Sequence, residues 1–256
     1  MSIILNERAW AEEAITYKSL GKKPSETLLR VARYYFDEQY SRQEVRKQLE
    51  AFLVQCDKNA SVVAWADTLR WAVATAAKFP MAKVSSVTVT KGELDTIAGV
   101  SSRQAGRLAF TLLCASKYWD AVNPKNNHWV NEKDVEIMRM ANMRPTIRRQ
   151  SQLFAELRDL GLIRFSNKVD NLNVQVLFSE EGGEAAMEIS DFRNVGFQYL
   201  KQLGEPFIKC ACCGLTIRAD IGPGRPRKYC DACAAQRKIE QSVNSVMRKR
   251  SGVTGK

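Results

Sequence analysis

Five of the seven cysteines in this 256-residue chain lie between positions 210 and 233. Two residues separate Cys210 from Cys213, and two separate Cys230 from Cys233, which is the spacing that places two thiolates on one side of a metal ion. Cys212 does not fit, because only one residue separates it from Cys210. Two matched pairs also disfavour a redox dithiol. The spacing predicts one structural Zn²⁺ held by four thiolates, with Cys212 as a non-ligand and no coordination position open to water.

The sixteen residues between the pairs contain two expected strands, 215–219 and 227–229, on either side of a turn at 222–224. A helix is expected after Cys233, since neither Gly nor Pro occurs before Gly252. A cysteine turn, a hairpin and a second cysteine pair that opens a helix resemble a treble-clef zinc finger. The stretch GRPRKYCDAC resembles the second half of small fingers in bacterial and phage proteins.

The last fifth of the chain is strongly basic. Residues 208–256 hold eleven Lys and Arg against three Asp and Glu, which is most of the net charge of +11. A basic domain of this kind indicates a polyanionic partner, most simply nucleic acid, although a solvated tail is the alternative. The candidate contacts in the finger are Arg225, Arg227, Lys228, Arg237, Lys238 and Arg248.

Residues 1–80 are predicted to be a helical scaffold or docking domain. Ser41 and Glu44 form a capping box before an apolar stripe, and Trp65 and Trp71 are expected in the core of a later helix that Pro80 ends. No motif in this region assigns it an activity.

Residues 81–179 offer two placements for a DNA-reading helix. In the first, Thr90 and Glu93 cap a short helix that Gly99 ends, and the helix over 102–118 follows as in a helix-turn-helix. In the second, a strand at 128–130 and a short helix precede a helix at 145–160, which Gly161 terminates before two strands around a polar turn. The second order, including the phrase LFAELRDLGLIRF, resembles a winged-helix domain, in which the third helix lies in the major groove beside the wing.

We favour the helix at 145–160, because a wing follows its recognition helix directly. Its apolar face is expected to comprise Ile147, Leu153, Phe154, Leu157 and Leu160. The predicted nucleic-acid contacts are Arg148, Ser151 and Gln152 on the exposed face, with Arg144, Arg149 and Lys168 flanking it. Plain protein–protein contact is the alternative role for such a domain.

The remaining features set the class of protein. Residues 180–207 are acidic and interrupted by glycine, which predicts a linker with a short helix before the finger at 208–256. The fold class is therefore mainly α, with an N-terminal helical domain, a winged-helix-like α/β domain and a small C-terminal zinc finger with four cysteine ligands. A single histidine, His128, and the lack of a phosphate loop or nucleophile elbow argue against an enzyme.

No apolar run approaches a membrane span and no basic leader opens the chain, so we expect a cytoplasmic protein with no membrane partner; the bacterial host cell is what the following resemblance implies. The combination resembles uncharacterised proteins of bacteriophages and mobile elements, which implies control of transcription or replication through duplex DNA. An RNA-binding protein and a module that inhibits a host polymerase or defence complex are the alternatives. The N-terminal helices would dock or dimerise.

Overall fold

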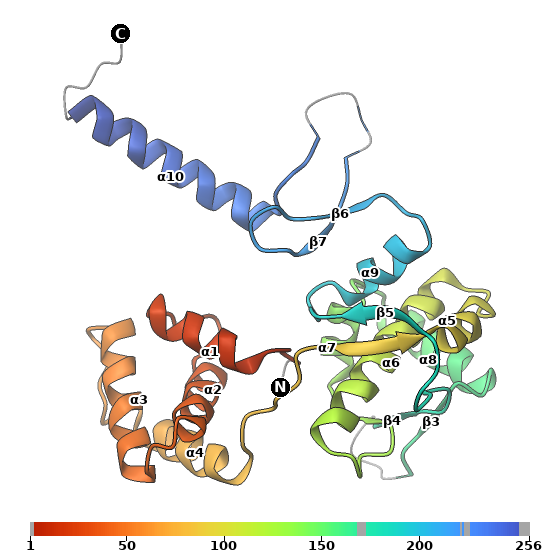
Figure 1. The fold of residues 1–256 in the computed structure, drawn as a ribbon, viewed down its shortest axis with the longest axis horizontal. Helices are drawn as coiled ribbons and strands as arrows, with labels where there is room; N and C mark the ends of the chain where they lie inside the picture. Colours follow the sequence, from red (N-terminus) through yellow and green to blue (C-terminus); the bar gives the residue numbers. More distant parts are fainter. Residues whose placement is uncertain (1–2, 168–172, 221, 223–225, 251–256) are drawn as a thin grey trace.

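The structure is a computed structural model that describes residues 3–167, 173–220, 222 and 226–250. Of residues 248–250 it describes the backbone alone. It is mainly α-helical, as predicted, with short antiparallel sheets. Figure 1 shows an N-terminal helical domain beside a larger central domain, with the cysteine-rich finger above them. Across the described ranges, no helix combines the length and hydropathy needed to cross a membrane.

Four helices build the N-terminal domain around one apolar core. They are α1 (Glu7–Thr16), α2 (Pro24–Asp37), α3 (Arg42–Cys56) and α4 (Ala66–Lys78). The predicted capping box of Ser41 and Glu44 is formed at the start of α3. Trp65 packs against this core, but the prediction that Trp71 is buried is wrong. The buried face of α4 comprises Leu69, Ala72, Val73 and Ala76.

A buried carboxylate joins this domain to the chain that leaves it. Glu7 is 1% exposed, and its Oε1 lies 3.1 Å from Arg30 and 3.0 Å from Arg33. Its Oε2 accepts a hydrogen bond from the backbone N–H of Ala82 at 3.2 Å. Because a buried ionised group needs compensating partners, these contacts fix α1 against α2 and against the connection to the central domain.

The central domain is built around α6 (Arg103–Val122), most of whose residues from Ala105 to Tyr118 are buried. The other elements are β1 (Val87–Thr90), α5 (Lys91–Ala98), β2 (Trp129–Val130), α7 (Asp134–Met140), α8 (Ile147–Asp159), β3 (Ile163–Phe165), β4 (Val174–Val176), β5 (Ala185–Ile189) and α9 (Val195–Gln202). The second predicted capping box, Thr90 with Glu93, is formed before α5. One sheet has the antiparallel order β2-β4-β3, and β1 pairs with β5.

The prediction of a linker at 180–207 is wrong, because this segment belongs to the central core. β5 pairs with β1, with Ile189 opposite Val87, and Ile189, Phe192 and Tyr199 are buried with the residues of α6. α9 crosses the end of α7 so closely that a Cβ on Gly196 would lie 2.1 Å from the carbonyl oxygen of Ala141. Only glycine permits this approach.

The finger contains β6 (Phe207–Lys209), β7 (Thr216–Arg218) and α10 (Asp231–Arg250). The hairpin differs from the prediction: β7 pairs with β6, which precedes the first cysteine, and 227–229 is not a strand. Of the turn predicted at 222–224, only Gly222 lies within the described residues. The antiparallel pair therefore encloses the first cysteine turn, and α10 projects away from it (Figure 1).

Candidate metal centre and basic surface

The sulfur atoms of Cys210, Cys213, Cys230 and Cys233 all lie within 4.8 Å of one another. The first pair belongs to the turn between β6 and β7, and the second pair stands at the start of α10. Cys213 Sγ and Cys230 Sγ are 3.7 Å apart. Zn–S bonds of about 2.3 Å in a tetrahedron place sulfurs about 3.8 Å apart, so the four residues fit a metal ion of this size. The predicted grouping is confirmed: these four cysteines can hold a metal ion.

Cys212 lies outside the cluster, as predicted. Its side chain is exposed, whereas Cys210 and Cys230 are buried. The sulfur of Cys212 is not among the four that converge. The sequence spacing was therefore sufficient to sort the five cysteines.

The backbone of the first cysteine turn is shaped by Gly214, whose φ of +70° is in the left-handed region. The N–H of Gly214 donates to the carbonyl oxygen of Cys210 at 3.0 Å, and Cys210 N–H donates to the carbonyl oxygen of Leu215 at 2.8 Å. These bonds close a tight turn that presents both thiols on one side. The N–H of Ala211 donates to the carbonyl oxygen of Lys228 at 2.9 Å, which ties the turn to the second pair.

Backbone donors also point at the sulfurs themselves. The N–H of Cys230 lies 3.3 Å from Cys210 Sγ, and the N–H of Cys233 lies 3.5 Å from Cys230 Sγ. Although burial opposes ionisation, backbone N–H groups of Cys213, Cys230 and Cys212 lower the pKa of the Cys210 thiol to about 6. Contacts with the sulfurs of Cys230 and Cys213 raise the pKa of Cys233. Four thiolates this close repel one another unless a cation lies between them, which is the electrostatic requirement of a metal site.

The central domain braces the first cysteine turn through Arg193. Its guanidinium donates to the carbonyl oxygen of Cys213 at 2.8 Å and forms an ion pair with Asp191, also at 2.8 Å. The hydrogen bond to Asp191 raises the pKa of Arg193, so the guanidinium stays charged. Arg193 was not predicted from the sequence, because it lies in the segment expected to be a linker and no local spacing connects it with the cysteines.

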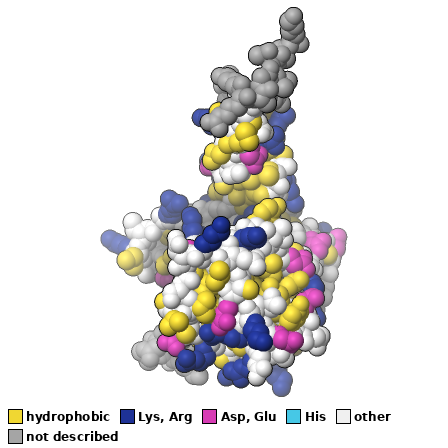
Figure 2. Space-filling model, turned by 90° about the vertical axis from the view of Figure 1, so that its left-hand side faces the viewer, with side chains coloured by type: hydrophobic (Ala, Val, Ile, Leu, Met, Phe, Trp, Pro, Cys, Tyr) yellow, Lys and Arg dark blue, Asp and Glu magenta, His cyan; other side chains and the backbone are white. Residues whose placement is uncertain are grey.

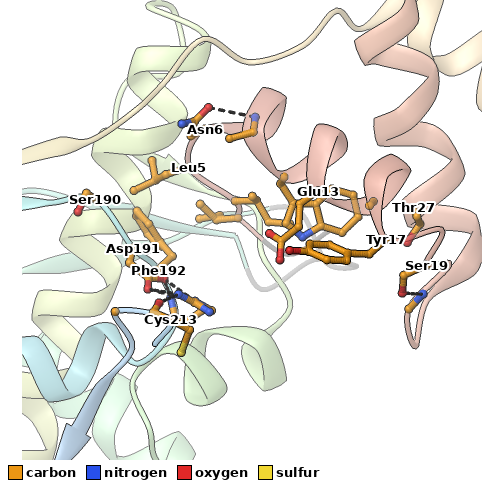
Figure 3. A pocket seen from close by; sticks show the side chains of 18 of the residues that line it. Leu5, Asn6, Glu13, Tyr17, Ser19, Thr27, Ser190, Asp191, Phe192 and Cys213 are labelled. Carbon is orange, nitrogen blue, oxygen red and sulfur yellow. Dashed lines mark hydrogen bonds and ion pairs between the residues drawn. The ribbon is translucent and has the colours of Figure 1, made fainter. Parts of the chain in front are cut away.

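This brace forms one wall of a cleft of about 930 Å³ between the finger and the N-terminal domain. Figure 3 shows Glu13 of α1 and Tyr17, which follows this helix, on one side, and Asp191, Phe192 and Cys213 on the other. The cleft separates the finger from α1, so the finger is held by the segment around Arg193 rather than by the N-terminal helices.

Some basic residues of the finger are bonded to other groups of the chain, and others are exposed and could contact a phosphate. Arg227 donates to the carbonyl oxygen of Tyr229 at 3.1 Å and to Asp231 at 2.6 Å, so it braces the start of α10 instead of standing free for phosphate. Arg237 stacks over the Tyr229 ring at 4.5 Å and is exposed, as are Lys228 and Lys238. Arg225 and the side chain of Arg248 lie outside the described residues.

The surface of α8 contains three of the predicted contacts together. Arg148, Ser151 and Gln152 are all exposed on this helix, and Arg144 is exposed just before it. Ile147 is 86% exposed, so the prediction that it lies in the apolar core is wrong. It is the first residue of α8, and the Oγ of Ser151 donates to the carbonyl oxygen of Ile147 at 3.1 Å. Leu160, also predicted to be apolar core, is exposed at the end of the helix.

Two other cations were predicted to flank this helix. Arg149 donates through Nε to Oε1 of Gln104 at 3.0 Å and lies 3.4 Å from Ser102 Oγ. It therefore fixes α8 against the start of α6 rather than flanking the helix as a free cation. Lys168 lies outside the described residues.

The alternative reading helix, 102–118, coincides with α6. Its middle is buried, and Arg107 donates to the carbonyl oxygens of Ala141 and Asn142 at 2.6 and 2.7 Å. The chain's one histidine contacts a neighbouring carboxylate: His128 Nδ1 lies 2.6 Å from Asp120 Oδ2.

Comparisons with protein-family models, with curated proteins and with solved structures gave no match to this chain.

Proposed function

We propose that this protein binds duplex DNA, with α8 reading base edges and the finger adding contacts to phosphates. The observation that carries the proposal is the exposed face of α8, where Arg148, Ser151 and Gln152 lie together on a helix followed directly by the β3–β4 hairpin. Arg and Gln side chains can form bidentate hydrogen bonds with guanine and adenine in the major groove.

The topology supports the same reading. From α6 onward the order is helix, strand, helix, helix, strand, strand, with β4 between β2 and β3. This order is what a winged-helix domain requires, with α8 as its third helix and the β3–β4 connection as its wing. The burial of α6 favours α8 over α6 as the helix that enters a groove.

The metal in this proposal is Zn²⁺, with a structural role. Four thiolates are a soft ligand set that suits zinc and fills its tetrahedron, so no position is left for a reacting water. Cys210 and Cys213 would hold it from the β6–β7 turn, and Cys230 and Cys233 from the start of α10. When bound, the ion neutralises thiolate charge and cross-links the two halves of the finger. Arg237, Lys228 and Lys238 are then available to phosphates on a rigid frame.

The resemblance to phage proteins extends the proposal to control of transcription or replication. Figure 2 shows Lys and Arg interspersed with Asp and Glu on one face of the body. This is the face of the N-terminal domain, and its described residues present no uniform cationic patch.

The test is a selection of bound duplexes from a random pool, followed by anisotropy titrations with the selected duplex at several salt concentrations. We expect enrichment of one motif and a linear fall of log affinity with log salt. Arg148→Ala with Gln152→Ala is expected to weaken binding about 30-fold or more and relax the preferred motif, because two base contacts are removed and each contributes about 1–3 kcal/mol.

The matched control makes the same types of substitution, one Arg→Ala and one Gln→Ala, in the N-terminal domain. Arg70→Ala with Gln55→Ala removes one cation and one amide from exposed positions on α4 and α3, and binding is expected to stay unchanged. Equal losses in both double variants would contradict a reading role for α8. Binding to RNA in preference to any duplex would favour the RNA-binding alternative, and no binding at low salt would favour a protein-interaction module.

A further inference from the structure

α10 exposes an apolar stripe that the rest of the described chain does not cover. Every residue from Ala234 to Met247 is exposed. Ile239 is 59% exposed, Val243 52% and Val246 48%. Figure 1 shows the helix projecting from the finger, and Figure 2 shows hydrophobic side chains along the part of the molecule that rises above the body.

Neither the metal site nor nucleic-acid binding accounts for this stripe. Phosphates would contact Arg237 and Lys238, but they cannot bury the methyl groups of valine and isoleucine. A solitary helix of this length is only marginally stable in water, and most helices gain stability by packing an apolar face. The stripe therefore indicates a partner surface that covers it.

The spacing of the stripe identifies the geometry of that partner. Ala232, Gln236, Ile239, Val243 and Val246 follow one another at alternating intervals of four and three residues. This interval produces the narrow seam of a coiled coil, whereas a helix that lies on a membrane has a broad apolar face with aromatic and leucine anchors. α10 has no aromatic residue and no leucine. Another helix with the same repeat fits this seam.

We propose that α10 packs against α10 of a second copy of this chain, in antiparallel orientation. The orientation follows from charge: α10 begins with Asp231 and ends in Arg248, Lys249 and Arg250. A parallel pair would bring the two basic ends together, whereas an antiparallel pair separates them and places each beside the start of the other helix, where Asp231 already pairs with Arg227. In the alignment with the longest overlap, Ile239 lies opposite Val243 of the second copy.

The seam spans about two heptads, so the interface is at the small end of specific protein–protein contacts and the dimer dissociates on dilution. A two-fold dimer also presents two copies of α8, which is the arrangement that reads a site with two related halves. The seam uses Ile239, Val243 and Val246, whereas the proposed phosphate contacts on the same helix are Arg237 and Lys238. The test of the dimer needs no nucleic acid.

The test is sedimentation velocity of the zinc-loaded full-length chain over about 1–200 µM, the range in which a contact of this size dissociates. We expect the mass to rise from monomer to dimer. Ile239→Glu with Val243→Glu is expected to remain monomeric, whereas Gln241→Glu with Asn244→Glu, which adds the same charge to the opposite face, is expected to dimerise. Metal content and far-ultraviolet circular dichroism of each variant establish that the finger and α10 are intact.

Cross-linking with a short bismaleimide tests the orientation in a Cys56→Ser and Cys212→Ser background, since Cys114 is buried and the other four cysteines are the candidate zinc ligands. The antiparallel alignment brings Ser242 near its counterpart and separates the two Ala235 positions by about 20 Å along the helices. Ser242→Cys is therefore expected to cross-link, and Ala235→Cys is not. A cross-link at both positions would overturn the antiparallel arrangement, because a parallel pair brings each position beside its counterpart.

Three results would overturn the dimer itself. They are a wild-type monomer at every concentration, a dimer that survives Ile239→Glu with Val243→Glu, and equal loss of the dimer in both double variants. Sedimentation with anionic phosphatidylglycerol vesicles is a parallel arm. A monomer that binds these vesicles through the stripe would assign α10 to a membrane surface instead.

Discussion

Arg193 donates a hydrogen bond to the carbonyl oxygen of Cys213 at 2.8 Å, and this bond ties the central domain to the turn that holds half of the candidate metal centre. Because Asp191 holds the same guanidinium, the donor is oriented before the finger binds metal. The groups around metal ligands set their orientation and contribute to metal affinity.

We predict that Arg193→Ala increases the rate of zinc transfer to a chromogenic chelator by about 10-fold or more, as is usual when an outer contact of a metal site is removed. Arg218→Ala is the matched control, since Arg218 is an exposed cation on β7 of the same finger. Unchanged transfer rates in Arg193→Ala would mean that the finger needs no support from the central domain.

The sorting of the cysteines gives a second prediction. Purified protein is expected to hold one zinc ion per chain. Cys212→Ser is expected to keep it, because Cys212 is exposed and outside the cluster, whereas Cys213→Ser is expected to lose the ion and the structure of the finger. Elemental analysis and circular dichroism measure both effects.

Acid is expected to release the same ion. Protons compete with the metal for the thiolates, so affinity falls as the pH is lowered and is recovered when it is raised. Equal zinc loss from the Cys212 and Cys213 variants, or metal-free protein with an intact finger, would contradict the assignment of ligands.

Local sequence signals predicted the parts of the structure that depend on near neighbours. The capping boxes of Ser41 with Glu44 and Thr90 with Glu93 are both formed, because a hydroxyl and a carboxylate three residues apart satisfy each other's backbone N–H groups within one turn. The C-x2-C pairs are similar: two ligands and one tight turn are specified within four residues. The sequence therefore predicted the cysteine grouping without knowledge of the fold.

Contacts between distant segments were not predictable in this way. β5 is acidic and preceded by two glycines, as in a linker, but it pairs with β1 and buries Ile189. A strand could pair with β7 from either side in the sequence, from 207–209 before it or from 227–229 after it. The sequence favoured the second, and the structure shows that β7 pairs with β6. Ile147 is apolar, but it is the first residue of α8 and is exposed, so its residue type alone misplaced it.

Arg149 and Arg148 are neighbours in sequence with different predicted roles. Arg149→Ala removes the hydrogen bond to Gln104, and we expect it to lower the free energy of unfolding by about 1 kcal/mol. Arg148→Ala is expected to change this free energy by less than about 0.5 kcal/mol, because it is an exposed surface substitution. Urea unfolding measures both.

DNA binding distinguishes the two residues a second time. Arg148→Ala is expected to change the preferred base at one position. Arg149→Ala is expected to weaken binding to all duplexes, because α8 is then held less firmly against α6. A change of base preference in Arg149→Ala, with stability intact, would show that its side chain leaves Gln104 to contact DNA.

The crossing of α9 over the end of α7 gives the last prediction. A Cβ at position 196 would lie 2.1 Å from the carbonyl oxygen of Ala141, and that atom belongs to the backbone, so neither side can yield without a shift of a helix. We expect Gly196→Ala to lower the free energy of unfolding by about 3 kcal/mol, as overpacking of a close contact does. Gly99→Ala is the control in the same domain, since its Cβ would meet nothing nearer than the carbonyl oxygen of Thr96 at 3.4 Å. Urea unfolding of the two variants compares them directly. Because α9 leads into the finger, an equal and small effect of both substitutions would mean that 195–202 does not pack on the core, and that the finger is joined to the central domain by a loose connection after all.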